Sequence, residues 1–377
     1  MYIQQEQLKN LGRLVRPGKV VVVYGPRRCG KTTLLKQYLK GVTKNYLFVT
    51  GEDIVVRKKL SSQSIEKLRN FVGKNKLLVI DEAQKIKNIG LNLKLIVDHL
   101  EGVEVIATGS SSFDLANNVG EPLTGRKFTL RMFPLSQIEI SGVEQLHETV
   151  ANLESRLIFG SYPEVVITRD NAERKEYLKE VVSSYLYKDI LELDGLRRPE
   201  KLVRLLQLLA FQIGKEVSHS ELGTQLGMSK NTVERYLDLL EKSFVVYRLN
   251  GFSRNLRKEI SKNSRYYFYD CGIRNALINN FNQIDLRDDI GMLWENYLIT
   301  ERIKKQEYQS LSANNFFWRT YSQEEIDFVE EKGGELFGYE MKWSPRKKDK
   351  APSDWVKAYA KAKYKVISRE NYIDFIT

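Results

Sequence analysis

The sequence predicts an α/β protein that begins with a parallel-sheet domain and continues into smaller helical and mixed units. Apolar runs alternate with amphipathic stretches through the first third of the chain, which is the pattern of βαβ units. The first apolar run, residues 20–24, leads directly into a glycine-containing loop and a helical stretch at residues 33–40. A chain of 377 residues is also too long for one ordinary core, so two or three domains are expected.

The loop after the first run has the pattern G-x-x-x-x-G-K-T, typical of a phosphate-binding loop. Its glycines let the backbone point N–H groups at an anion, and the helix that begins at Lys31 adds the positive end of its dipole. Lys31 is expected to reach the β- and γ-phosphates of ATP, and the Thr32 hydroxyl to bind Mg²⁺. A chance glycine-rich turn is the alternative. The predicted nucleotide-binding residues are Gly25, Pro26, Arg27, Arg28, Cys29, Gly30, Lys31, Thr32 and Thr33.

The later strands of this sheet are expected at residues 46–50, 77–80, 103–107 and 127–132. Ligands bind at the carboxyl ends of such strands. Asp81 follows the second of these runs and is expected to hold Mg²⁺, directly or through water, while Glu82 orients and deprotonates the attacking water. Ser110 follows the next run and is the first candidate to touch the γ-phosphate or that water. Solvated acids and a polar turn are the structural alternatives.

Arg126 precedes the last of these predicted strands. An arginine at this position could reach the nucleotide of a neighbouring subunit and stabilise the charge of the transition state. Arg131 competes for the same role.

The charge of the chain favours an anionic partner. The net charge is +12, and nucleic acid is the usual partner of such a protein, although a solvated basic face is the alternative. No apolar run is long enough to span a membrane and residues 1–12 lack a signal-peptide pattern, so a cytoplasmic location without a membrane partner is expected. Two cysteines and three dispersed histidines indicate neither a disulfide framework nor a zinc site.

The segments GPRRCGKT, LLVIDEAQ, ATGSSS, LTGR and FPLS resemble the ATPase domain of prokaryotic AAA+ proteins of the MNS clade, in particular the AAA_14 and DUF4143 type with a C-terminal nuclease-like domain. The resemblance covers essentially the whole chain. It implies the strand order 5-1-4-3-2 and ATP bound between the subunits of a homo-oligomer, of which a hexamer is one form. In related ATPases a Gly-x-x-Pro segment that begins a lid helix lies against the nucleotide, so Pro163 is expected to contact ATP. The lid arginine of other AAA+ clades has no identifiable counterpart.

From residue 201 the pattern changes to short helices at residues 202–213, 220–226 and 230–242, which resemble a helix-turn-helix. Ser229 is expected to cap the last helix, and Gly227 to allow the tight turn. Residues 197–265 contain 14 basic and 7 acidic side chains, so phosphate neutralisation is the expected role. A structural lid or a protein contact is the alternative. The residues predicted to contact DNA are Lys230, Asn231 and Arg235 in the helix, and Arg254, Arg257 and Lys258 in the basic loop of a wing.

Three acids and a lysine in the last third of the chain resemble the PD-(D/E)xK nuclease pattern. Glu295 lies in a predicted helix, Asp327 in a predicted strand, and Glu340 and Lys342 share one face of the next strand. Asp327 and Glu340 would coordinate Mg²⁺ or Mn²⁺ with help from Glu295, while Lys342 would position or deprotonate water. An apolar strand with acids at its edge is the alternative.

The predicted domains are an AAA+ P-loop core at residues 1–150, a helical lid or connector at 151–199, a winged helix at 200–265 and a restriction-endonuclease-like α/β domain at 266–377. The predicted function is ATP hydrolysis by a protein that acts on DNA, double-stranded or branched, through a metal-dependent nuclease-like domain. Two alternatives remain. One is a remodelling ATPase that grips DNA without cleaving it, and the other is a nucleotide-controlled signalling switch.

Overall fold

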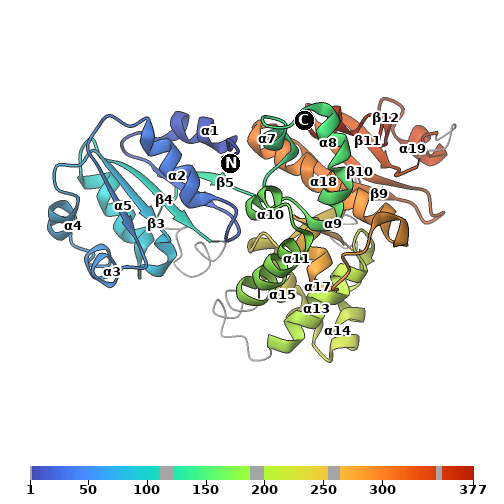
Figure 1. The fold of residues 1–377 in the computed structure, drawn as a ribbon, viewed down its shortest axis with the longest axis horizontal. Helices are drawn as coiled ribbons and strands as arrows, with labels where there is room; N and C mark the ends of the chain where they lie inside the picture. Colours follow the sequence, from blue (N-terminus) through green and yellow to red (C-terminus); the bar gives the residue numbers. More distant parts are fainter. Residues whose placement is uncertain (1, 111–122, 187–198, 254–263, 345–349) are drawn as a thin grey trace.

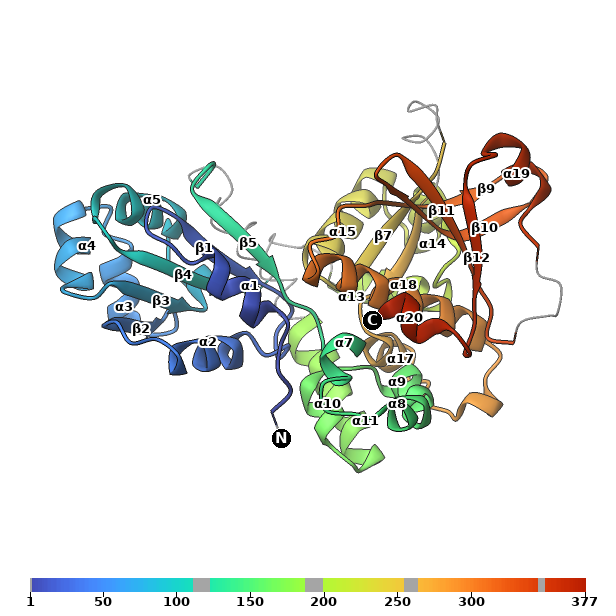
Figure 2. The same cartoon turned by 90° about the horizontal axis from the view of Figure 1, so that it is seen from above.

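The computed structural model describes residues 2–110, 123–186, 199–253, 264–344 and 350–377. Two lobes are visible in both Figure 1 and Figure 2. The first lobe contains the parallel sheet, and the second contains a larger mixed sheet with most of the remaining helices. No helix within the described ranges is both long and apolar enough to cross a lipid bilayer.

The first lobe is built on a five-stranded sheet in which every strand pair is parallel. The strand order is β2-β3-β4-β1-β5, which confirms the order implied by the family resemblance. The strands lie where the apolar runs predicted them: β1 (Val20–Tyr24), β2 (Tyr46–Thr50), β3 (Leu77–Asp81), β4 (Glu104–Gly109) and β5 (Lys127–Arg131). The helical elements of this lobe are α1 (Gln7–Leu14), α2 (Lys31–Lys40), α3 (Ile54–Leu60), α4 (Ile65–Val72), η1 (Ala83–Lys85) and α5 (Ile89–His99).

The central strands β1, β3 and β4 of the first sheet are buried on both faces. Successive side chains of a strand point to opposite faces, so Val20 and Val22 of β1 join a core with residues of α3, α4 and α5. Val21 and Val23 join a second core with residues of α1 and α2. Because both faces are apolar there, β1 and β3 read in the sequence as continuous hydrophobic runs rather than as alternating ones.

The second lobe begins with short helices and continues into longer ones. They are α7 (Gln137–Ile140), α8 (Leu146–Ala151), α9 (Leu153–Phe159), α10 (Pro163–Ile167), α11 (Asn171–Glu180), the π-helical η2 (Val181–Leu186), α13 (Pro199–Phe211), α14 (His219–Leu226), α15 (Lys230–Lys242), α17 (Cys271–Leu277), the 3₁₀ turn η3 (Ile284–Leu286), α18 (Ile290–Tyr308), α19 (Ser353–Ala358) and α20 (Tyr372–Ile376). One hydrophobic core runs from Phe133 to Ile376 and includes residues of α9, α10 and α11. The helices predicted as the lid therefore pack with the second lobe, not with the parallel sheet.

The second sheet has seven strands in the order β12-β11-β10-β9-β7-β8-β6. They are β6 (Glu216–Val217), β7 (Val246–Gly251), β8 (Ser264–Phe268), β9 (Asn314–Arg319), β10 (Glu325–Lys332), β11 (Glu335–Met341) and β12 (Lys363–Ile367). Strand β7 pairs antiparallel with β8 and parallel with β9. The boundary predicted between residues 265 and 266 thus falls inside β8, and the two units predicted on either side of it share one sheet.

The helix-turn-helix elements lie at the predicted positions. Ser229 accepts a hydrogen bond from the backbone N–H of Thr232 and so caps α15. Gly227 has a left-handed backbone with φ of 58°, as the tight turn after α14 requires.

Candidate active site

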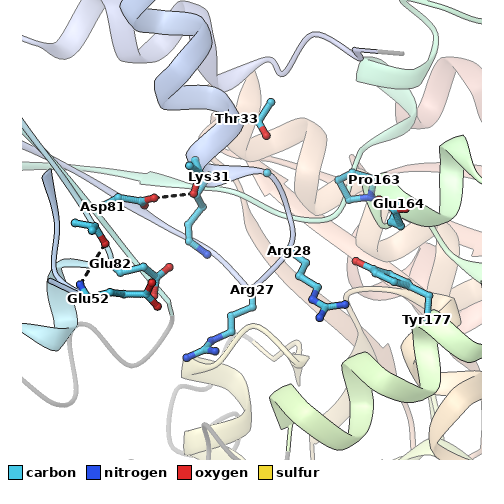
Figure 3. Close-up of a pocket in the computed structure, with 13 residues that line it drawn as sticks. Arg27, Arg28, Lys31, Thr33, Glu52, Asp81, Glu82, Pro163, Glu164 and Tyr177 are labelled. Carbon is cyan, nitrogen blue, oxygen red and sulfur yellow. Dashed lines mark hydrogen bonds between the residues drawn. The ribbon is translucent and has the colours of Figure 1, made fainter. Parts of the chain in front are cut away.

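A cavity of about 780 Å³ lies at the carboxyl edge of the parallel sheet, between the loop after β1 and helices α10 and α11 (Figure 3). The first lobe forms one wall, and the second lobe forms the other through Pro163, Glu164 and Tyr177. Most predicted nucleotide-binding residues line this cavity. The lining residues are Arg27, Arg28, Gly30, Lys31, Thr32, Thr33, Thr50, Glu52, Asp81, Glu82, Pro163, Glu164 and Tyr177.

The Lys31 side chain is held against the loop at the floor of the cavity. It is buried, and its Nζ donates hydrogen bonds to the carbonyl oxygens of Gly25 and Pro26 at 2.9 Å each. An ammonium group has three donors, so an anionic ligand in the cavity would add a further partner to this fixed cation. Cys29 does not line the cavity, because its side chain is buried in the core beneath the loop.

The loop conformation requires glycine at position 30. Gly30 has φ of 101°, and a Cβ atom there would lie 2.5 Å from Nε2 of Gln5. The Gln5 amide in turn donates to the Cys29 carbonyl at 3.3 Å. The N-terminal segment thus supports the loop from below, a role that the sequence pattern does not reveal.

Asp81 connects the loop to the neighbouring strands. Its carboxylate accepts hydrogen bonds from the hydroxyl of Thr32, at 2.7 Å, and from that of Thr108. A hydroxyl and a carboxylate in contact are hard oxygen ligands of the kind that Mg²⁺ uses together with substrate phosphates. The residues present at this point therefore fit the Mg²⁺ site that the sequence predicts.

Glu82 directly follows Asp81 and has a left-handed backbone with φ of 51°. Its carboxylate accepts a hydrogen bond of 2.6 Å from the amide of Gln84, and the same amide donates to the Ser110 hydroxyl at 3.2 Å. Ser110 is buried and does not line the cavity. It therefore contacts Glu82 through Gln84, and the motif gave no indication of this intermediary.

The second lobe contacts the loop directly. The Arg28 guanidinium pairs with Glu180 of α11 at 2.8 Å and lies 5.3 Å from the ring of Tyr177, toward which it extends in Figure 3. Burial raises the pKa of the Tyr177 phenol to about 12, so this side chain is neutral in the physiological range. Pro163 occupies the first turn of α10, where its missing N–H causes no loss.

The loop that carries Pro163 is fixed by an acid that is distant from it in the sequence. Asp270 accepts a hydrogen bond from the backbone N–H of Ser161 at 2.7 Å. Gly160 has φ of 73°, and a Cβ atom on it would lie 2.1 Å from the Asp270 carboxylate. The wall of the cavity is therefore attached to the segment that follows β8.

Comparison with known proteins agrees with this arrangement. Residues 17–141 match the family model of an AAA domain. Residues 150–284 and 290–374 match two domains of unknown function, DUF8612 and DUF4143. The DUF4143 match covers α18 and the strands from β9 to β12.

Two sequence relatives and one solved structure are similar to most of the chain. The chain is 27% identical over 346 residues to the uncharacterized protein Rv2008c of Mycobacterium tuberculosis, covering 90% of this chain and 74% of that protein. It is 25% identical over 336 residues to the uncharacterized protein MJ1544 of Methanocaldococcus jannaschii, covering 83% and 72%. Among solved structures, the Walker-type ATPase PABY2304 of Pyrococcus abyssi aligns with a TM-score of 0.47 at 15% identity, covering 74% of this chain and 96% of that one.

Arg126, which precedes β5, and Arg131, which ends it, lie at opposite edges of the parallel sheet. The strand register places Val20 beside Lys127 and Tyr24 beside Arg131, so Arg126 lies at the end of the sheet away from the P-loop. Arg126 instead pairs with Asp98 of α5. It does not contribute to the cavity of its own chain, and its role beside a neighbouring subunit stays a prediction. Arg131 lies at the P-loop end and approaches Glu307 of α18 at 3.7 Å.

The predicted DNA-contacting residues of α15 are exposed. Asn231 and Arg235 line a groove of about 710 Å³ with Arg248 of β7, and Lys230 lies at the start of the same helix. Two acids, Glu234 and Asp238, line this groove as well. The other predicted residues, Arg254, Arg257 and Lys258, lie outside the described residues.

The structure brings together the predicted nuclease-like residues of the DUF4143 domain. We call Glu295, Asp327 and Glu340 the acid cluster. Burial raises the pKa of each, that of Glu295 to about 7, and the mutual repulsion of the carboxylates adds to the effect. Lys342 pairs with Glu340 at 2.5 Å, so the two side chains share a face as predicted.

A residue that the sequence pattern did not include lies in the acid cluster. The Arg265 guanidinium from β8 is 3.7 Å from Glu295 and 3.9 Å from Asp327. Within the described ranges, no group of three or more acidic, histidine or cysteine side chains is arranged to hold a metal ion. The residues of the acid cluster therefore do not fit the Mg²⁺ or Mn²⁺ that the nuclease pattern implies.

Proposed function

We propose that the protein is an ATPase that binds Mg²⁺–ATP in the cavity between its two lobes. The observation that supports this is the convergence of Lys31, the Thr32–Asp81 pair and Glu82 on one cavity in an AAA domain. Lys31 would bind the β- and γ-phosphates, and the oxygen atoms of Thr32 and Asp81 would hold Mg²⁺. The ion would neutralise charge on the phosphate oxygens.

Glu82 is the proposed general base. It would take a proton from the water that attacks the γ-phosphate, while Gln84 orients its carboxylate. The base and the phosphates would lie on the first lobe, whereas Pro163 and Tyr177 would enclose the rest of the nucleotide from the second. Exclusion of water from the cavity would then require both lobes to be close together.

Phosphate release tests this proposal. Lys31→Ala should abolish ATP turnover, because the buried ammonium on the cavity floor is lost. Lys36→Ala is the matched control, since Lys36 is an exposed lysine of the same helix α2 and lies outside the cavity. Equal turnover by the wild type and Lys31→Ala would show that the site is wrongly assigned.

We propose DNA, double-stranded or branched, as the partner. Support comes from the net charge of +12 and from the exposed groove beside α15, where Asn231, Arg235 and Arg248 present hydrogen-bond donors. Since Glu234 and Asp238 line the same groove, few phosphates would be neutralised there. We therefore expect Arg235→Ala to weaken binding and to reduce the slope of log affinity against log salt by about 1.

Fluorescence anisotropy with duplex and four-way-junction DNA at several salt concentrations measures this effect. Lys36→Ala again serves as a control, because it removes one positive charge on the other lobe. If no DNA form shows salt-sensitive association, DNA is not the partner. Slow turnover, tightly held ADP and no affinity for DNA would together favour a nucleotide-controlled signalling switch.

We also propose a homo-oligomer, a hexamer being one form. Arg126 lies too far from its own P-loop to act there, so a role as charge-stabilising finger requires a second subunit. Sedimentation velocity with and without ATP tests the assembly. Mixing Lys31→Ala and Arg126→Ala chains tests the finger, because only a mixed interface would join an intact cavity to an intact arginine.

DNA cleavage is the competing proposal for the DUF4143 domain. It predicts Mg²⁺- or Mn²⁺-dependent cutting of labelled linear, single-stranded or junction DNA that disappears in Asp327→Ala and Lys342→Ala. Binding without cutting would leave this domain as a DNA grip. Arg265 lies beside Glu295 and Asp327, and this position favours binding without cutting.

A further inference from the structure

The acid cluster is located where the DUF4143 domain meets a strand of the neighbouring unit. Glu295 comes from α18, Asp327 from β10 and Glu340 from β11, whereas Arg265 comes from β8. All three acids are largely buried, and carboxylates in such a place require a compensating cation. The question is whether that cation is a metal ion or a side chain.

Arg265 is a buried cation that lies beside two members of the acid cluster. Its side chain is only 5% exposed, its Nη2 donates to Glu325 at 2.8 Å, and its Nη1 lies 3.7 Å and 3.9 Å from Glu295 and Asp327. Its guanidinium also lies 4.5 Å from the ring centroid of Phe317, a cation–π contact. A guanidinium that is paired, stacked and buried at once has little freedom to leave.

The remaining side chains around the acid cluster are also engaged with protein groups. Oδ2 of Asp327 accepts a hydrogen bond from the backbone N–H of Met341 at 2.8 Å, and the Tyr267 hydroxyl donates to Glu295 at 2.6 Å. Lys342 pairs with Glu340. A divalent cation needs oxygen ligands at about 2.0–2.6 Å. Because Nη1 of Arg265 lies 3.7 Å from Glu295 and 3.9 Å from Asp327, a cation that bridged these two acids would meet the guanidinium at close range.

We propose that Arg265 is the resident cation of the acid cluster, where it fastens α18 and β10 to β8 and takes the place of a divalent metal. The acid cluster is then an internal joint of the second lobe and not a metal-dependent cleavage site. This inference does not depend on the proposed ATPase activity. An observation that points the other way is Glu340 Oε2, which is buried and has no hydrogen-bond partner among the described residues.

Urea unfolding in EDTA and in rising concentrations of MnCl₂ tests the proposal on the full chain. All four tryptophans lie between residues 294 and 355, so their fluorescence reports on the second lobe, which contains the acid cluster. An Asp81→Asn background keeps Mn²⁺ away from the other candidate site. We expect the midpoint to be the same in EDTA and in millimolar MnCl₂. A midpoint that rises with Mn²⁺, and ceases to do so when Asp327→Asn is added, would overturn the proposal.

Arg265→Met is the complementary variant, because it leaves the buried acids without their cation. We expect it to be less stable in EDTA and to gain stability with each tenfold increase in Mn²⁺, a gain that Asp327→Asn removes. If the Arg265→Met chain folds and its urea midpoint does not change with Mn²⁺, the arginine does not take the place of a metal ion. If this variant does not fold, Arg265→Lys decides. Arg265→Lys keeps a positive charge, so we expect its urea midpoint to be the same with and without Mn²⁺. A midpoint that changes with Mn²⁺ in this variant would again overturn the proposal.

Discussion

Two glutamates line the nucleotide cavity, and only one of them is expected to be the general base. Glu82 follows β3, and Glu52 follows β2 at the edge of the same sheet. Their backbones are adjacent, since a Cβ atom on Gly51 would lie 2.2 Å from the Glu82 carbonyl oxygen. Exchanging each acid for its amide therefore makes the same chemical change at two neighbouring positions of one cavity.

The strand order indicates which acid matters. The P-loop follows β1, and β3 lies two strands away from β1 while β2 lies three. At about 4.8 Å per strand, these positions are about 10 Å and 14 Å from β1. Glu82 is the nearer, and its neighbour Asp81 contacts Thr32 of the P-loop. Glu82 also holds a hydrogen bond from Gln84 that fixes its orientation, whereas Glu52 is exposed.

The expected loss of turnover in Glu82→Gln follows from the role of Glu82 as general base. A positioned general base contributes about 10²- to 10⁴-fold to a rate, which is about 3–5 kcal/mol of activation free energy. Glu82→Gln should lower phosphate release at saturating ATP by that factor, since the amide keeps the shape and an oxygen acceptor for Gln84. Glu52→Gln should lower it by less than about threefold.

Phosphate release and anisotropy of a fluorescent ATP analogue, measured side by side, separate chemistry from binding. Both variants should bind the analogue within about threefold of the wild type, because neither change removes a phosphate-binding group. A Glu82→Gln enzyme with more than a third of the normal rate would refute the assignment. So would a collapse of turnover in Glu52→Gln.

Three further results are expected. Tyr177→Ala should weaken nucleotide binding by about 2- to 13-fold, the equivalent of about 0.5–1.5 kcal/mol for a lost aromatic contact, while Tyr177→Phe should bind normally. Gly160→Ala should lower the free energy of unfolding in a urea titration far more than Gly73→Ala. Both glycines have positive φ, which costs about 1–2 kcal/mol in alanine, but only at Gly160 would the new Cβ strike Asp270. Glu295 should make stability fall with rising pH, because burial raises its pKa from 4.5 to about 7. Its contribution is complete below about pH 4.5 and is lost by about pH 7, a fall on the order of 3 kcal/mol that Glu295→Gln should remove from tryptophan-monitored unfolding.

The first lobe could be predicted closely because its signals are local. Each strand is a short apolar run bounded by turn residues, and the whole phosphate-binding loop fits within the eight residues from Gly25 to Thr32. Burial of the central strands on both faces produces such runs, so these strands could be recognised without knowledge of their register. The same is true of the caps at Ser229 and Gly227, whose partners lie within a few residues of them.

The connections between the lobes could not be predicted, because their partners are distant in the sequence. Arg28 and Glu180 are 152 positions apart, and Ser161 and Asp270 are 109 apart. Neither pair belongs to a periodic pattern or a motif. Within the acid cluster, some residues could be predicted and one could not. Spacing within two strands and a helix predicted its acids, but the arginine among them comes from a strand assigned to another unit.

Strand β8 joins the two sites of the second lobe, and this limits how ATP turnover can act. Arg265 and Tyr267 of β8 contact the acid cluster, and Asp270, three residues after Tyr267, holds the loop that carries Pro163 into the nucleotide cavity. Helices α9 to α11 share one core with β8. A closing movement of the cavity wall must therefore either break the Ser161–Asp270 hydrogen bond or carry the whole second lobe with it. The continuous core favours the second course, because a buried carboxylate that lost this partner would be left partly unsatisfied. The nucleotide would then act on the relative position of the two lobes, and the Arg28–Glu180 pair is a contact at their junction that such a movement would change.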